Sequence, residues 1–222
     1  MIIYCLTFLC FLLLYILFDV NYFIRMAFTI GWSRLFHKRR KLLEKTIIYG
    51  LCLTSDVDIF LKHMNNARYL RELDFARSCF YDSSGIFAEI RRKGGSVLQT
   101  ASSIRYRRPI PVFSPYKITT QLVHWDDKSL YIEHEFVSLS DDFVYTTALS
   151  KQSAMGPKVH IPDIIEKIEP GIRLPELSEE LSLWLKSIDE SSLKFKRIRR
   201  DKDLEKNEGE KDDVEVFLSN PA

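Results

Sequence analysis

The amino-acid sequence predicts an α+β fold in which an antiparallel sheet of about five strands packs against one long helix. Three observations support this prediction. Four runs with period-two alternation of apolar and polar residues follow one another between residues 96 and 154. A fifth run, residues 46–58, is rich in β-branched and aromatic residues, and a long helical pattern begins near Asn65. Because a lone helix beside antiparallel strands must bury its apolar stripe, the sheet and the helix are expected to share one core.

The N-terminal segment is apolar enough to enter a membrane. Residues 2–18 read IIYCLTFLCFLLLYILF and contain no charged side chain. As a helix this run would span roughly 26 Å, near the thickness of the hydrocarbon core of a bilayer. A cleaved signal peptide is the alternative, but it would require a basic segment before the apolar run and a small-residue cleavage site after it. We therefore expect residues 1–36 to form a transmembrane anchor followed by an interfacial segment.

Basic residues on the C-terminal side of this segment predict its orientation. Arg25, Arg34 and the run of residues 38–41 all follow the apolar stretch, so the positive-inside rule places the body of the protein in the cytosol. The chain has no Asn-x-Ser/Thr sequon, and its four cysteines do not resemble a disulfide framework, which agrees with that side of the membrane. Residues 37–45 are expected to be a basic juxtamembrane linker.

The long helix has one clearly apolar face. The positions i, i+4, i+7 and i+11 supply it, namely Tyr69, Leu73, Ala76 and Phe80. The charged side chains on the rest of the helix are interpreted as a solvated face with i, i+3 and i, i+4 pairing; they are Arg68, Arg71, Glu72 and Arg77. Glycines then separate this helix from a short second helical piece, residues 86–92.

Four strands are expected to follow as a meander, over residues 96–108, 116–125, 129–139 and 142–154. Short polar turns join the last three as hairpins, whereas prolines between residues 109 and 115 make the first link a loop. In the third strand one face carries Leu130, Ile132, His134 and Phe136. Residues 46–156 are therefore expected to form the main domain.

The C-terminal part has a different pattern. Residues 157–193 contain two stretches with helical spacing, each with a proline near its start, and are expected to form a helical extension. Residues 194–222 carry a basic cluster followed by a mostly acidic run, which predicts a disordered, charged tail.

Residues suited to acid–base chemistry lie at the start of the long helix. Asn65 and Asn66 are good N-caps, and the positive end of the helix dipole could hold a developing oxyanion. His63 lies just before the helix and is the side chain best suited to proton transfer near neutral pH. Asp56 and Asp58 upstream, and Asp74 two turns into the helix, are the candidate carboxylates. The arrangement is compatible with general-base hydrolysis of an activated acyl group, whereas the spacing alone favours helix capping and a structural histidine.

Two longer segments resemble a known family. DVDIFLKHMNNARYLRELDFAR, residues 56–77, resembles the helix start of hotdog-fold thioesterases, whose pattern runs Asp, a short turn, His-Val-Asn-Asn, then a Tyr and an acidic helix. IRYRRPIPVFSPYKITTQLVHWDDKSLYIEHEFVSL, residues 104–139, resembles the meander of that fold. The resemblance implies a hotdog fold, in which the sheet wraps around the helix, and a homodimer formed through paired sheets. It also implies acyl-CoA or a related lipid thioester as ligand.

The resemblance assigns a role to each candidate residue. Asp58 would activate a water molecule, with Asp74 as the other candidate carboxylate, and His63 would position or polarise the thioester. Asn65, Asn66 and Tyr69 would contact the substrate. Many small hotdog enzymes have the pattern Asp-x-x-Gly-His, whereas here Asp58 lies five residues before His63 and Lys62 replaces the glycine. Plant acyl-carrier-protein thioesterases carry an Asn two residues before the His, where this chain has Leu61.

Two functions are compatible with this sequence. The first is a membrane-anchored thioesterase that faces the cytosol and hydrolyses long-chain acyl-CoA. The second is a catalytically inactive hotdog protein at the endoplasmic reticulum membrane, which binds acyl-CoA, another lipid or a protein partner. The net charge of +2 gives no reason to expect a nucleic acid as partner, no metal-ligand spacing joins the histidines, and no cofactor is expected.

Overall fold

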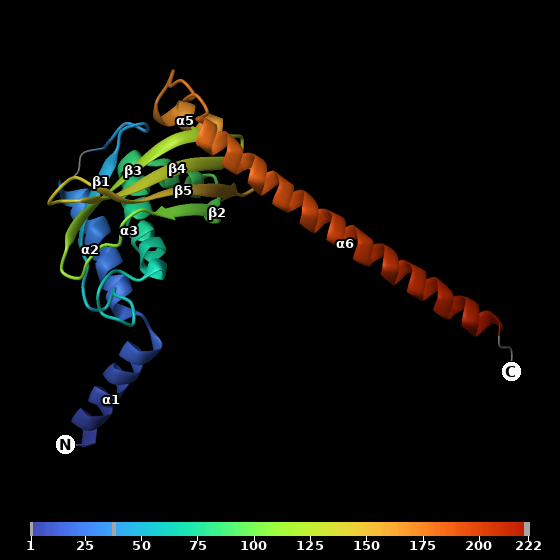
Figure 1. The fold of residues 1–222 in the computed structure, drawn as a ribbon, viewed down its shortest axis with the longest axis horizontal. Coiled ribbons are helices and arrows are strands. Elements are labelled where there is room, and N and C mark those ends of the chain that lie inside the picture. The colour runs from blue at the N-terminus through green and yellow to red at the C-terminus, as the bar shows by residue number, and fades with distance from the viewer. Residues whose placement is uncertain (1, 37–38, 220–222) are drawn as a thin grey trace. The chain divides into compact units, whose positions relative to one another are not determined.

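The computed structural model describes residues 2–36 and 39–219 of the chain (Figure 1). They belong to two compact units, Met1–Glu176 and Leu177–Ala222. The first unit contains an antiparallel sheet together with the helices that cover it, and it holds every residue of the candidate site.

The sheet has five strands in the order β1-β3-β4-β5-β2. Their bounds are Thr46–Leu51, Ser96–Tyr106, Pro115–Trp125, Ser129–Ser138 and Val144–Met155 for β1 to β5. Hairpins join β3, β4 and β5 as predicted, but the prediction of a four-strand meander is wrong for β2, which pairs with β5 at the far edge. The proline-containing link of residues 107–114 cannot close a hairpin, so it carries the chain from one side of the sheet to the other.

The long helix, α3 (Asn66–Ser84), packs against the sheet (Figure 1). Its apolar stripe is buried as predicted, with Tyr69, Leu73, Ala76 and Phe80 each at most 1% exposed. On the sheet, the predicted inward face of β4 is also buried, including His134. His134 forms hydrogen bonds with Thr120 and Ser150 and is therefore a core residue. The helix and the concave side of the sheet thus form the hydrophobic core of the unit.

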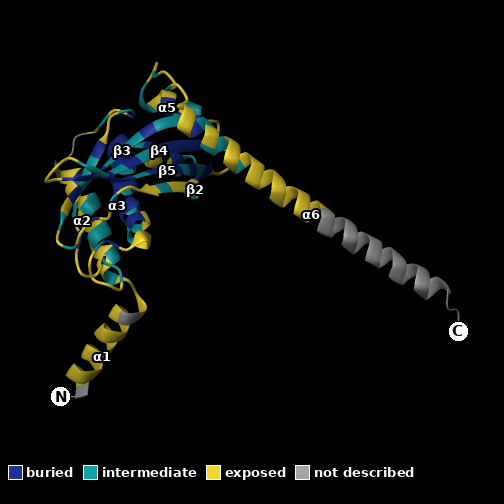
Figure 2. Ribbon diagram, viewed as in Figure 1, coloured by how far each residue is buried: buried dark blue, intermediate teal, exposed yellow. Residues whose placement is uncertain are grey.

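The N-terminal segment forms two helices, α1 (Ile2–Leu17) and α2 (Val20–Phe36). No single described helix is both long enough and apolar enough to cross a bilayer, whereas Ile3–Tyr15 and Val20–Leu35, bent by 73°, meet those criteria as a pair. The described side chains of α1 are exposed (Figure 2). The next helix, α2, lies against α3. Both α1 and α2 belong to the first unit.

The interpretation of the charged side of α3 as a solvated face is wrong. Glu72 is fully buried and Arg77 is only 9% exposed, because α2 covers this side of the helix. The side chains of α2 pair with those of α3, as in the ion pairs Arg25–Glu72 and Arg34–Asp82. Glu72 is thus a buried charge that is paired with a side chain of the neighbouring helix.

The C-terminal segment contains two helices within its described residues. A short helix, α5 (Ile161–Ile168), follows β5 and buries Ile161, Ile164 and Ile165 in the same cluster as Phe80, so it belongs to the main domain. The second unit is one helix, α6 (Glu179–Ser219), in the region where a disordered tail was predicted from residue 194 on. Glu, Leu and Lys are the commonest residues of α6, and all three have high helix propensity.

Candidate active site at the start of the central helix

A closed turn joins Asp58 to His63 just before α3. The amide of Asp58 donates to the carbonyl oxygen of His63 at 2.9 Å, and the amide of Leu61 donates to the carbonyl oxygen of Asp58 at 3.0 Å. Leu61 has a φ of 54°, in the left-handed region, which non-glycine residues seldom adopt. The turn has one residue more than the pattern Asp-x-x-Gly-His. The left-handed conformation of Leu61 accommodates that residue, so that Asp58 and His63 still meet.

The turn brings the carboxylate to the imidazole. Oδ2 of Asp58 lies 3.7 Å from Nε2 of His63, and the two side chains are 17% and 42% exposed. This separation is within ion-pair range but longer than a hydrogen bond, and a water molecule can bridge such a gap. Nδ1 of His63 lies 3.2 Å from the carbonyl oxygen of Met64, which can only accept, so this contact is a hydrogen bond in the tautomer with a proton on Nδ1. The proton on Nε2 then decides whether His63 faces Asp58 as a cation.

The surroundings of Asp58 keep its carboxylate ionised. Partial desolvation by itself would raise the pKa of Asp58, but the amide of Lys62 and the neighbouring His63 outweigh it and lower the pKa below its ordinary value. The Lys62 amide donates directly to Oδ1 at 3.2 Å. Oδ2, the oxygen nearer to His63, is therefore the one placed to accept a proton from a water molecule.

Asn65 and Asp56 position the start of α3. Asn65 is the N-cap, with its side-chain oxygen accepting from the Ala67 amide at 2.9 Å, and its own amide donates to the Asp56 carbonyl oxygen at 2.8 Å. The Asp56 carboxylate is buried and accepts from Arg68 at 2.6 Å. Because the Asn65 amide is already used, Asn66, the first residue of the helix, has the amide best placed for an oxyanion.

Two other predicted site residues lie elsewhere. Asp74 accepts from the hydroxyl of Tyr22 at 3.3 Å and pairs with Arg77, so the structure does not bring it together with Asp58 and His63. Tyr69 is 1% exposed and its hydroxyl accepts from the Ile110 amide at 3.1 Å. Tyr69 therefore fixes the link between β2 and β3 from inside the core, where a substrate has no access to it.

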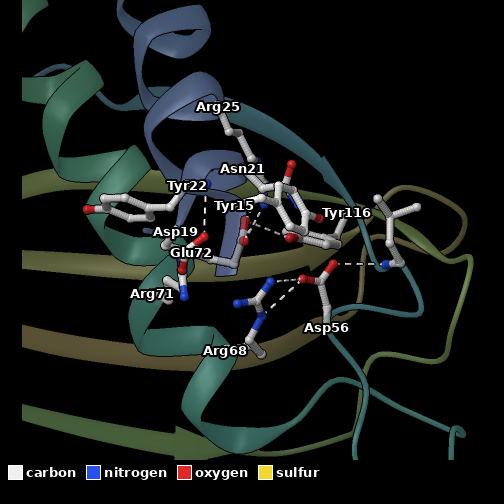
Figure 3. Close-up of polar contacts among 11 residues, drawn as sticks. Tyr15, Asp19, Asn21, Tyr22, Arg25, Asp56, Arg68, Arg71, Glu72 and Tyr116 are labelled. Carbon is white, nitrogen blue, oxygen red and sulfur yellow. Dashed lines mark hydrogen bonds and ion pairs between the residues drawn. The ribbon is translucent and has the colours of Figure 1, made fainter. Parts of the chain in front are cut away.

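A buried ion pair that was not predicted from the sequence joins Glu72, further along α3, to Arg25 (Figure 3). Both carboxylate oxygens of Glu72 accept from Arg25 of α2 at 2.5 Å, and the hydroxyl of Tyr116 on β3 donates to Glu72 at 2.9 Å. Burial holds the pKa of the Tyr116 hydroxyl well above its ordinary value, so this group stays a donor. Phe75 and Cys79, at i+3 and i+7 from Glu72, were the available signal, because they extend a second buried stripe along α3.

Tyr116 reaches Glu72 because of a glycine on the neighbouring strand. Gly50 of β1 is the register partner of Tyr116, and a Cβ atom at Gly50 would collide with the Tyr116 ring. Within the described residues, no cluster of three or more His, Cys, Asp or Glu side chains is arranged to hold a metal ion.

Comparisons with known proteins agree with this architecture. Residues 52–185, more than half of the chain, match the model of the thioesterase-like superfamily. The chain is 51% identical to Protein THEM6 of Drosophila melanogaster over 191 residues, covering 86% of this chain and 96% of that protein. It is 39% identical to Protein THEM6 of Xenopus laevis over 178 residues, covering 79% and 84% of the two chains. The name stands for thioesterase superfamily member 6.

Solved structures show the same fold at low sequence identity. A 1,4-dihydroxy-2-naphthoyl-CoA thioesterase from Synechocystis superposes with a TM-score of 0.50 at 11% identity, covering 60% of this chain and all of that one. A putative oleoyl thioesterase from Lactobacillus plantarum gives 0.51 at 13% identity, covering 61% and 56% of the two chains. With the hotdog fold, the matched segment and these relatives in agreement, the chain belongs to the thioesterase-like superfamily.

Proposed function

We propose that this protein is a membrane-anchored thioesterase that hydrolyses long-chain acyl-CoA with a water molecule activated by Asp58. One observation carries the proposal. In a chain of thioesterase-like fold, the turn before the central helix holds the Asp58 carboxylate 3.7 Å from the His63 imidazole. A carboxylate and an imidazole side by side, next to a helix N-terminus, supply the groups that hydrolysis of an activated acyl group requires.

The reaction proceeds by direct attack of water. Asp58 accepts a proton from a water molecule, and at the same time the oxygen of that water molecule forms a bond to the thioester carbonyl carbon. The amide of Asn66 and the positive end of α3 stabilise the resulting oxyanion. When the carbonyl re-forms, the C–S bond breaks, and protonated His63 delivers a proton to the departing sulfur. Asp58 then transfers the water-derived proton back to His63, and the products are a carboxylic acid and CoA thiol.

A second copy of the chain would complete the substrate site. The edge strand β2 has 11 residues, most of them exposed or half-exposed, and has a neighbour only on its β5 side. An edge of this length is a template for pairing with another strand. We propose a homodimer in which two β2 strands join the two sheets, with the thioester bound at the subunit boundary.

The membrane assignment rests on the N-terminal helix. The described side chains of α1 are apolar and mostly exposed, as expected for a helix in contact with lipid. Basic residues follow it, which by the positive-inside rule directs the hotdog domain to the cytosol. We propose the endoplasmic reticulum as the membrane. An oily acyl chain partitions into the bilayer, so such an anchor would bring the enzyme to its substrate.

A second candidate function is acyl-CoA or lipid binding without turnover. It is favoured by the gap between Asp58 and His63, which exceeds a hydrogen bond, and by Lys62 at the position where related enzymes have glycine. In that case the same residues would recognise the thioester head but would not activate water.

Hydrolysis of acyl-CoA by the full-length chain in lipid nanodiscs distinguishes the two functions. The rate is measured for chain lengths from short to long, for the wild type and for Asp58→Asn, His63→Gln and Asp58→Ala/His63→Ala. Loss of a general base should lower the rate by about 10²–10⁴-fold. Asp142→Asn is the matched control, since Asp142 is 82% exposed and pairs with Lys117.

Each outcome decides between the candidates. A rate that is highest for long chains and lost in the double variant supports the enzyme. Equal rates for the wild type and the double variant, combined with saturable binding of acyl-CoA, would establish the binding protein in its place. Asp74→Asn should resemble Asp142→Asn, because Asp74 faces Tyr22 and Arg77.

A further inference from the structure

A largely apolar cavity lies between α2, β1 and α3. Its volume is about 600 Å³, within the range of about 300–1,000 Å³ that is usual for small-molecule sites. The walls are formed by α2 through Phe28, Thr29, Trp32 and Ser33, by residues 47–51 of β1, and by Phe75 and Cys79 of α3. Neither Asp58 nor His63 lines this cavity.

A second, charged cavity adjoins the first. It has a volume of about 330 Å³, and the two cavities share Arg25, Leu53 and Phe75 in their walls. Three arginines and three carboxylates line it, as the pairs Arg25–Glu72, Arg68–Asp56 and Arg71–Asp19 (Figure 3). The two cavities together therefore have one apolar end and one charged end.

We propose that the two cavities together bind one long-chain fatty acid, with its hydrocarbon chain between α2 and β1 and its carboxylate at Arg71. The inference goes beyond the proposed hydrolysis, since it concerns a different set of residues and requires no turnover. A fatty acid is also the acid product that an acyl thioesterase would release.

The length of the site favours a long, single chain. The residues of α2 that line it run from just before the helix, at Asp19, to Ser33. At 1.5 Å per residue this is about 21 Å along the helix axis. The cavity volume is small for a folded segment of another protein, and its walls are mainly apolar, so a single hydrocarbon chain is the ligand that fits.

The charged end contains one arginine that can change partners. Glu72, the partner of Arg25, is fully buried, and Asp56, the partner of Arg68, is only 3% exposed. These two ion pairs are therefore expected to stay in place. The side chains of Arg71 and Asp19 are 31% and 48% exposed, and exposed ion pairs contribute little net stability. A ligand carboxylate can therefore replace Asp19 on Arg71 at small cost, and Arg presents a planar fork that matches a carboxylate.

Photo-crosslinking tests the proposal on the full-length chain in phospholipid vesicles. The probe is palmitic acid with a diazirine near its methyl end, and crosslinked peptides are mapped by mass spectrometry. We expect saturable labelling of residues 47–51 on β1 and of 28–33 on α2, suppressed by unlabelled palmitate. Labelling confined to α1, or labelling of β1 that excess palmitate does not reduce, would show bilayer contact only and overturn the proposal.

Variants that fill the cavity provide the matched comparison. Thr29→Phe on α2 and Ile47→Phe on β1 place a ring in the chain site from opposite walls, and each should reduce saturable labelling of β1 about tenfold, equivalent to about 1.4 kcal/mol. Ile24→Phe is the control, because Ile24 is 63% exposed on α2 and does not line the cavity. Circular dichroism of each variant tests whether it is folded. Two variants that fill the cavity are used so that the test still holds if one of them does not fold. Undiminished labelling in folded variants contradicts the site.

Arg71→Gln tests the charged end separately. It should weaken competition by palmitate several-fold and leave competition by hexadecanol, which lacks the carboxylate, unchanged. If both competitors respond equally, the carboxylate is not at Arg71 and the proposed orientation is wrong. Asp58→Asn should leave all labelling unchanged, so failure of the hydrolysis proposal and failure of this one can be distinguished.

Discussion

The two faces of α3 are both covered by other elements, but they use opposite chemistry. One face presents Leu73 and Phe80 to the sheet, where they lie in clusters of buried apolar side chains. The other face presents Glu72 and Arg77 to α2, and its contacts are ion pairs and hydrogen bonds. A buried face can therefore be charged when its charges have partners, on the neighbouring helix for Glu72 and on the same helix for Arg77. The stability of the two faces should respond differently to substitution.

The largest effect is expected on the sheet face. Phe80→Ala removes a ring that is 1% exposed within the main core cluster, and such truncations cost about 3–5 kcal/mol. Urea unfolding of the full-length chain in detergent, followed by circular dichroism, measures the change. Phe87→Ala is the control, since Phe87 is 40% exposed on α4 (Ile86–Arg92), and an equal loss in both variants would mean that burial does not set the cost.

The α2 face should lose less, and its loss should be reversible. Arg25→Met leaves Glu72 buried without its cation, and breaking a buried pair in this way costs about 3–5 kcal/mol. Because the Arg25 side chain is 36% exposed, we expect a smaller loss of about 2–3 kcal/mol. Adding Glu72→Gln should recover most of that loss, since the amide carries no charge. The matched control is Arg34→Met on the same helix, where an exposed pair with Asp82 should change stability by at most about 0.5 kcal/mol. No recovery in the double variant would show that Arg25 acts by packing alone.

The sheet core also contains a buried histidine, His134. Burial, assisted by Arg77, lowers the pKa of His134 to about 3, whereas the unfolded chain titrates near 6.5. Between these values the unfolded state binds a proton that the folded state does not, so stability falls as pH decreases from 6.5 toward 3. The slope from this group is about 1.4 kcal/mol per pH unit.

The histidine contribution is isolated by a difference measurement. His134→Gln cannot titrate, so its stability should depend less on pH than that of the wild type between pH 6.5 and 4. Urea unfolding at several pH values gives both curves. Parallel curves would mean that His134 does not titrate differently in the two states.

The smallest effect is expected at the helix start, where both faces begin. Asn65→Ala removes the side-chain acceptor of the Ala67 amide and should cost about 1 kcal/mol. The Asn66 side chain is exposed, so Asn66→Ala should change stability by less than about 0.5 kcal/mol. Thermal unfolding of the two variants compares the adjacent residues, and equal losses would contradict the assignment of Asn65 as the cap.

Local patterns predicted the elements of the fold well. Period-two alternation located β3 and β4 to within a residue or two, and the i, i+4, i+7 stripe identified the face of α3 that packs on the sheet. The turn residues Asp58 and His63 were also found from the sequence, and the structure places them next to each other. These features depend on neighbours in the chain, which is the information that a sequence pattern contains.

Features that depend on distant contacts were missed. The pairing of β2 with β5 is decided by which edge of the sheet is free, and no residue of β2 specifies it. The burial of Glu72 depends on Arg25, which lies 47 residues earlier in the chain. Because Arg25 lies in a segment that resembles a membrane anchor, its role as the partner of a core carboxylate could not be read from spacing.

Leu61 has a consequence for the way related sites are recognised. Its left-handed conformation lets five residues of chain span a gap that four span in Asp-x-x-Gly-His, so the acid and the histidine meet although their sequence separation differs. A search that demands a fixed number of residues between the two would overlook this chain. Family members with insertions in this turn can be compared by asking whether a backbone hydrogen bond joins the acid to the histidine, as the one from the Asp58 amide to the His63 carbonyl oxygen does here.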